Sequence, residues 1–134
     1  MIRNLIALAC LFGALISCDR AEHKLEGKWQ LKTVEADGVV QTVDTVWYNF
    51  QTSLFQYQLY DASKGYLTML GYKTLEDEKT LEIELIKDEG SLPLDKFLSR
   101  TDWTTPKRLF RIEKSTVKNL VLSSEGKTYT FKKF

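Results

Sequence analysis

Few side chains in this sequence could carry out nucleophilic, acid–base or metal chemistry. His23 is the only histidine, and the chain has two cysteines, Cys10 and Cys18. A Ser-His-Asp triad or a Cys-His pair needs a histidine beside the nucleophile, and a zinc site needs several histidine or cysteine ligands. The residues available cannot supply either set, and the sequence has no glycine-rich phosphate-binding loop.

Carboxylates remain as candidates, because two of them can act together as acid and base. Glu82 and Glu84 alternate with apolar residues, which predicts that they face solvent on a strand, and residues 76–78 form a charged turn. We therefore expect no catalytic residue, metal site or cofactor, and no enzymatic activity. Binding is the class of function that is left.

The thiol of Cys18 follows an apolar stretch near the N-terminus. Residues 5–16 are mostly apolar, Arg3 is the only charge before them, and the small residue Ser17 precedes the cysteine. A run of about 12 residues has signal-peptide length and is too short to span a bilayer. The stretch resembles the lipobox of bacterial lipoproteins, which implies cleavage before Cys18 and acylation of its sulfur.

Two other interpretations of the N-terminal stretch stay open. One is a secretory signal without lipid, whose cleavage also prefers small residues. The other is a buried helix or strand, although a core helix would carry a polar face, which residues 5–16 lack. On the lipoprotein interpretation, residues 1–17 are a signal peptide that is removed, 18–24 are the lipidated cysteine and tether, and 25–134 form one domain.

The lipoprotein interpretation predicts where the protein is located and the net charge of the mature chain. Without Arg3, the remaining 18 basic residues match 18 acidic ones, so no basic surface for nucleic acid is expected. No disulfide can form once Cys10 is removed and Cys18 is acylated. We expect a lipid-anchored protein of the cell envelope, at the outer rather than the inner membrane, held to membrane lipid through Cys18.

From Leu25 onward, apolar and polar residues alternate with the period of two that is typical of half-buried strands. Short turns with glycine or charged residues separate the segments, as at Gly38, Gly65 and Gly126. About eight strands spaced in this way predict an antiparallel barrel or sandwich. The expected strands are residues 25–33, 46–50, 54–60, 66–74, 81–85, 109–113, 119–123 and 127–134, and residues 39–43 alternate weakly.

Residues 88–107 interrupt the alternation. Leu94, Phe97 and Leu98 recur at helical spacing directly after Pro93, which predicts a short helix with the proline in its first turn. The apolar stripe of this helix could lie against one end of a sheet or barrel.

Three landmarks resemble the small lipocalin-like (calycin) lipoproteins of Gram-negative bacteria. They are Leu25-x-Gly27-x-Trp29-x-Leu31, Phe50-x-x-x-x-Phe55, and Leu120-x-Leu122 followed by Gly126-Lys-x-Tyr129-x-Phe131-x-Lys133. The resemblance implies an all-β, up-and-down barrel of about eight antiparallel strands with one short helix, in which Gly27 and Trp29 close one end. In that superfamily an arginine of the last strand usually covers the tryptophan, and here the last strand offers Lys132 and Lys133.

Aromatic side chains on the expected strands are the candidates for binding. In one hypothesis they line a cup for a small apolar ligand. In the other they fill the interior, and the domain docks on an envelope protein or inhibits one. Trp103 is either a lid over the open end or an anchor that pins the loop. The candidate lining residues are Trp47, Phe50, Phe55, Tyr57, Tyr66, Tyr129, Phe131 and Trp103.

Overall fold

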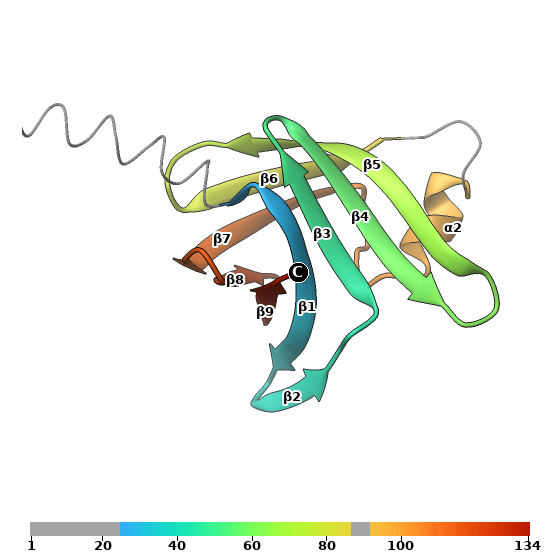
Figure 1. The fold of residues 1–134 in the computed structure, drawn as a ribbon, viewed down its shortest axis with the longest axis horizontal. Helices are drawn as coiled ribbons and strands as arrows, with labels where there is room; N and C mark the ends of the chain where they lie inside the picture. Colours follow the sequence, from blue (N-terminus) through green and yellow to red (C-terminus); the bar gives the residue numbers. More distant parts are fainter. Residues whose placement is uncertain (1–24, 87–91) are drawn as a thin grey trace, which may run out of the picture.

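Nine strands and one short helix make up the described part of the chain, which covers residues 25–86 and 92–134 of a computed structural model (Figure 1). The expectations about the signal peptide, Cys18 and the tether, and about residues 87–91, lie outside the described residues. The elements are β1 (Gly27–Ala36), β2 (Val39–Thr42), β3 (Val46–Gln51), β4 (Leu54–Asp61), β5 (Gly65–Leu75), β6 (Thr80–Leu85), α2 (Leu94–Leu98), β7 (Lys107–Ser115), β8 (Asn119–Ser124) and β9 (Lys127–Lys133).

Pairing between the first and last strands closes the sheet into a barrel. Each strand from β3 to β9 pairs antiparallel with the next, and β1 pairs with both β3 and β9. The extra strand β2 pairs only with the far half of β1, where Ala36 lies opposite Val39. The predicted up-and-down barrel of eight strands is therefore confirmed, with β2 added at its rim.

Alternation along the strands sends one set of side chains into the barrel. On β4, Phe55, Tyr57 and Leu59 are buried, while the residues between them are more exposed. The same pattern holds on β6, where Leu81 and Ile83 are fully buried. Strand parity, rather than hydrophobicity alone, thus decides which residues form the core.

One end of the barrel is closed by Trp29, which is fully buried. Its indole nitrogen donates a hydrogen bond to the carbonyl of Leu25 at 2.8 Å. The ammonium group of Lys133, on β9, lies 4.5 Å from the centre of the indole ring. Gly27 has a φ of 116°, and a Cβ there would collide with the Lys133 side chain. Glycine therefore leaves the room in which Lys133 covers Trp29.

The opposite end holds α2 and the segment that follows it (Figure 1). The predicted helix is present, but Pro93 is its N-cap residue rather than part of its first turn, and Phe97 is its buried residue. The ring of Phe97 lies 5.3 Å from that of Tyr57, on the inner side of β4. Hydrogen bonds from Thr101 to the carbonyl of Leu98 (2.9 Å) and from the Trp103 amide to the Thr101 hydroxyl (3.0 Å) fold the chain back toward the barrel.

Truncation of Trp29 should destabilise the domain strongly. Trp29→Ala is expected to lower the free energy of unfolding by about 3–5 kcal/mol, because it removes a fully buried aromatic side chain. Lys133→Met, which removes only the cation, should cost about 0.5–2 kcal/mol. Urea unfolding of each variant measures the change. Val40→Ala is the control, since Val40 is 58% exposed, and an unchanged midpoint for Trp29→Ala would contradict the buried position.

Candidate functional site

Tyr48 stands at the centre of the barrel interior, although it was not among the candidates from the sequence. It is 1% exposed. Its ring centre lies 4.8 Å from that of Phe131 and 5.1 Å from those of Phe55 and Tyr57. Three more rings lie within 6.4 Å, those of Phe50, Trp103 and Phe110.

The interior of the described barrel is packed with side chains. Phe50 and Phe131 have no exposed surface, and Tyr57 and Trp103 are each 3% exposed. A void large enough for a ligand would leave part of the surrounding side chains accessible to a water-sized sphere, and these are not. Six of the candidates face this core, namely Phe50, Phe55, Tyr57, Trp103, Tyr129 and Phe131.

Two candidates lie elsewhere, and the expectation that they line the interior was wrong. Trp47 precedes the inward-facing Tyr48, so strand alternation turns it to the outside of the wall. Tyr66 is 63% exposed and pairs across the ladder with Tyr60, which is also exposed. In the sequence, Phe50 indicated which face of this strand points inward, because Tyr48, two residues before it, must lie on the same face and Trp47 on the other.

Trp103 enters the mouth of the barrel as a plug. Its ring lies 5.7 Å from Phe110 and 5.9 Å from Tyr57, and its indole nitrogen donates to the Tyr48 hydroxyl at 3.1 Å. The guanidinium carbon of Arg108 lies 5.7 Å from the Trp103 ring. Of the two interpretations from the sequence, the ring position fits an anchor that is itself part of the core.

Arg108 is buried inside the mouth, and hydrogen bonds compensate its charge. It donates to the hydroxyl of Tyr129 at 2.6 Å and to that of Ser124 at 3.0 Å. It also forms an ion pair with Asp102 at 3.3 Å. A buried cation without such partners would be costly, so this set is a structural network that ties β7, β8 and β9 to the loop before β7.

The buried tyrosine hydroxyls at the mouth, Tyr129 in this network and Tyr48 beside Trp103, are poor acids. Burial raises the pKa of Tyr48 well above its ordinary value. Burial, followed by the hydrogen bond with Asp102, also raises the pKa of Tyr129. Both groups therefore stay protonated near neutral pH and cannot serve as bases. The described ranges contain no group of histidine, cysteine, aspartate and glutamate side chains that could hold a metal ion.

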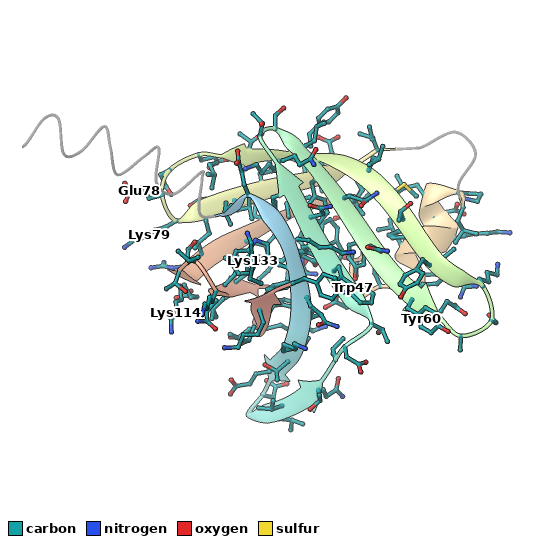
Figure 2. The ribbon with its side chains drawn as sticks, viewed as in Figure 1. Trp47, Tyr60, Glu78, Lys79, Lys114 and Lys133 are labelled. Atoms are coloured by element: carbon teal, nitrogen blue, oxygen red, sulfur yellow. The ribbon has the colours of Figure 1, made fainter. Side chains whose placement is uncertain are left out.

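The outer surface of β3, β4 and β5 carries no charge at its outward positions, and we call it the uncharged face. Figure 2 labels Trp47 and Tyr60 on this wall. The outward positions of β6 and β7 differ, since they include Glu82, Glu84 and Arg111. The uncharged face consists of Trp47, Asn49, Gln51, Leu54, Gln56, Gln58, Tyr60, Tyr66, Thr68, Leu70, Tyr72 and Thr74.

The half of the uncharged face next to the β3–β4 turn is hollowed. A shallow pocket of 190 Å³ is lined by Asn49, Gln51 and Gln56 together with apolar carbon of Leu54 and Leu70. A second hollow, of 490 Å³, shares Asn49 and Gln51 with the first and extends beyond the face to Gly27 and Glu26. Amide side chains, which can both donate and accept hydrogen bonds, therefore line both hollows.

Aromatic rings stand at the α2 end of the uncharged face. The ring centre of Tyr66 lies 5.8 Å from that of Trp47 and 5.2 Å from that of Tyr60. Phe134, 69% exposed, packs against the other side of Trp47 at 6.0 Å. The indole nitrogen of Trp47 is buried beneath these rings and has no hydrogen-bond partner among the described residues. The sequence already held the signal for this face, since between residues 46 and 75 it has only three charges, Asp61, Lys64 and Lys73.

A further hollow, of 620 Å³, lies on the other side of the barrel. Its lining mixes acidic and basic groups, including Glu82, Lys107 and Glu125. Lys107 and Glu82 form an ion pair at 2.8 Å, so opposite charges neutralise each other there. The described helix does not have the length and apolarity needed to cross a membrane.

Comparison with known proteins agrees with the fold. Residues 11–134 match the family described as a lipocalin-like domain. A lipocalin-like protein from Bacteroides uniformis ATCC 8492 is 30% identical, with a TM-score of 0.73 over 83% of this chain and 99% of that one. An uncharacterized protein from Bacteroides eggerthii DSM 20697 is 32% identical, with a TM-score of 0.66 over 82% of this chain and 99% of that one. Among proteins with curated descriptions, none matches significantly. With the closed eight-stranded barrel, these matches show that the chain belongs to the lipocalin-like family.

Proposed function

We propose that this protein is a lipid-anchored, non-enzymatic binding protein of the cell envelope that binds its ligand on the outer wall of the barrel. The observation that carries the proposal is the filled interior, where aromatic rings surround Tyr48 and Trp103 plugs the mouth. Small-ligand binding is typical of the lipocalin-like fold. Of the surfaces that stay accessible, the uncharged face combines exposed aromatic rings with amide side chains.

Binding inside the barrel is the second candidate, and the family likeness favours it. A ligand in the interior would have to displace Trp103, which is 3% exposed and hydrogen-bonded to Tyr48. Removing a large buried aromatic from a core costs about 3–5 kcal/mol. An internal ligand would have to recover that free energy before any net affinity appeared. The outer wall carries no such penalty, because its side chains are already in contact with solvent.

The anchor and the tether would set the orientation at the membrane. Leu25 lies at the Trp29 end of the barrel, because its carbonyl accepts the indole hydrogen bond. The six residues 19–24, fully extended, reach about 20 Å. With acylated Cys18 in the outer leaflet of a membrane, the Trp29 end would face the lipid and α2 would point away. The uncharged face would then stand on a side wall, open to the surrounding envelope.

An apolar fluorescent probe distinguishes the interior from the outer wall. The unmodified protein should show no saturable internal site, whereas Trp103→Ala should gain one, since it opens a cavity beside Tyr57. Filling that cavity again with Tyr57→Trp in the Trp103→Ala background should abolish the gain. Saturable binding by the unmodified protein that is lost in Tyr57→Trp alone would overturn the outer-wall proposal in favour of an apolar ligand inside.

The lipid anchor is tested at Cys18. Cys18→Ala should leave an uncleaved or soluble protein, because acyl chains contribute about 0.8 kcal/mol per buried CH₂ and stable anchoring needs more than one chain. Cell fractionation followed by a high-salt wash measures this, with Ser17→Ala, which keeps a small residue before the cysteine, as the control. A Cys18→Ala protein that still fractionates with membranes after the wash would contradict the lipoprotein interpretation.

A further inference from the structure

From the uncharged face we infer a site for a neutral oligosaccharide, an inference that rests on the proposed outer-wall function and names its ligand class. Three properties carry it. The face lacks charge over three neighbouring strands, it offers amide side chains around a depression, and it exposes flat rings at both of its ends.

The lack of charge argues against an ionic ligand. Every outward residue of β4, from Leu54 to Tyr60, is apolar, aromatic or an amide. The chain as a whole is 28% charged, so a wall of this width without a charge departs from its own composition. The outward residues of β3, β4 and β5 offer no counter-ion to a phosphorylated or carboxylated ligand. A cation borders the face at one edge, where the ammonium group of Lys28 on β1 lies 5.5 Å from the centre of the Trp47 ring.

The amides in the middle argue for hydroxyl groups on the ligand. Asn49 lies opposite Gln56 in the ladder, and Gln58 lies opposite both Trp47 and Thr68. An amide both donates and accepts, and so does a hydroxyl, so the two can pair in either sense. An aliphatic ligand laid over these groups would bury them without hydrogen bonds, which is costly. Their position at the centre therefore disfavours a purely apolar ligand.

The two ends of the face present apolar surfaces on which a sugar ring can stack. At one end Tyr66 is 63% exposed beside Trp47 and Tyr60, and at the other Tyr72 is 52% exposed opposite Leu54 in the ladder. From Leu54 to Tyr60 the strand advances six residues, or about 20 Å at roughly 3.3 Å per residue. A single sugar cannot touch both ends, so the ligand that uses the whole face is a chain of several units.

This arrangement differs from that of an ordinary protein interface. Protein interfaces place apolar and aromatic side chains at the centre and polar groups at the rim. Here the amides Asn49, Gln56 and Gln58 share the two central rows of the face with Trp47, Leu70 and Thr68, and Tyr60, Tyr66 and Tyr72 stand at the ends. The 190 Å³ pocket between them is smaller than the roughly 300–1,000 Å³ of sites that enclose a drug-sized molecule. It suits one ring of an extended chain that lies along the wall.

The test uses the full chain in a zwitterionic detergent without a sugar headgroup. Binding of maltoheptaose, cellohexaose and mannohexaose is measured by saturation-transfer NMR and intrinsic tryptophan fluorescence, with the corresponding monosaccharides for length and hexagalacturonate for charge. At least one neutral oligosaccharide should bind saturably, with its monosaccharide and hexagalacturonate at least tenfold weaker. Tyr66→Ala and Tyr72→Ala should each weaken binding about fivefold to tenfold, since each removes one stacking surface.

Two controls separate this inference from the function on which it rests. Leu109→Ala, at an exposed outward position of β7 on the other wall, should bind like the unmodified protein. All substituted side chains are exposed, and a urea midpoint confirms that each variant is folded. If none of the neutral chains binds, or if Tyr66→Ala and Tyr72→Ala bind them unchanged, the saccharide site is refuted, while the Cys18 and interior-probe results stand independently.

A second copy of the chain is the competing occupant of the face. Sedimentation of the unmodified protein and of Tyr66→Ala decides this. A dimer that Tyr66→Ala converts to a monomer would show that the face is self-associating and would overturn the saccharide assignment. A monomer in both cases, together with saturable oligosaccharide binding, supports it.

Discussion

The pairing of β1 with β9 closes the sheet, and the contents of the barrel follow from that closure. An eight-stranded barrel has an interior just wide enough for side chains to fill, or for one small ligand. A bulge in β1 between Leu31 and Thr33 shifts the register by one residue, so that Leu31 lies opposite Phe131 and Val34, rather than Thr33, lies opposite Tyr129 and packs against the core. The rings around Tyr48 then take up the available volume. Among the described strands, closure also leaves only β2 at an edge of the kind that invites aggregation, and β2 is short.

A tryptophan and a cation close each end of the barrel, but the cations are held differently at the two ends. At each end a tryptophan lies under a cation, Lys133 at 4.5 Å from Trp29 and Arg108 at 5.7 Å from Trp103. Lys133 lies on β9, directly opposite Trp29 of β1. Arg108 is fixed by Tyr129 and other polar partners, and removing any one of them would leave buried donors unpaired. The mouth is thus held by directional bonds as well as by packing, which disfavours an interior that opens for a ligand.

Sequence alternation predicted most strands to within a few residues, and the landmarks around Gly27, Trp29 and Tyr129 distinguished a barrel from a sandwich. Alternation alone could not, because closure depends on the pairing of residues 27–36 with 127–133, which no local pattern encodes. The errors at Trp47 and Tyr66 were errors of parity. In residues 46–50, aromatic or apolar side chains occupy adjacent positions, so alternation did not say which of Trp47 and Tyr48 faces inward, and Trp47 was included among the lining candidates. The ladder assigns that place to Tyr48.

Because core and wall are formed by different residues, substitutions on the wall can change binding without disturbing the core. Outward positions of β4 and β5 contribute little to stability, since exposed substitutions usually alter the free energy of unfolding by about 0.5 kcal/mol or less. Interior positions such as Tyr48 and Phe131, each 1% exposed or less, touch too many neighbours to vary without cost. In a lipocalin that binds inside its cup, a change of ligand must repack the core. In a filled barrel, ligand preference can be rewritten on the wall while the core that holds the wall in place stays the same.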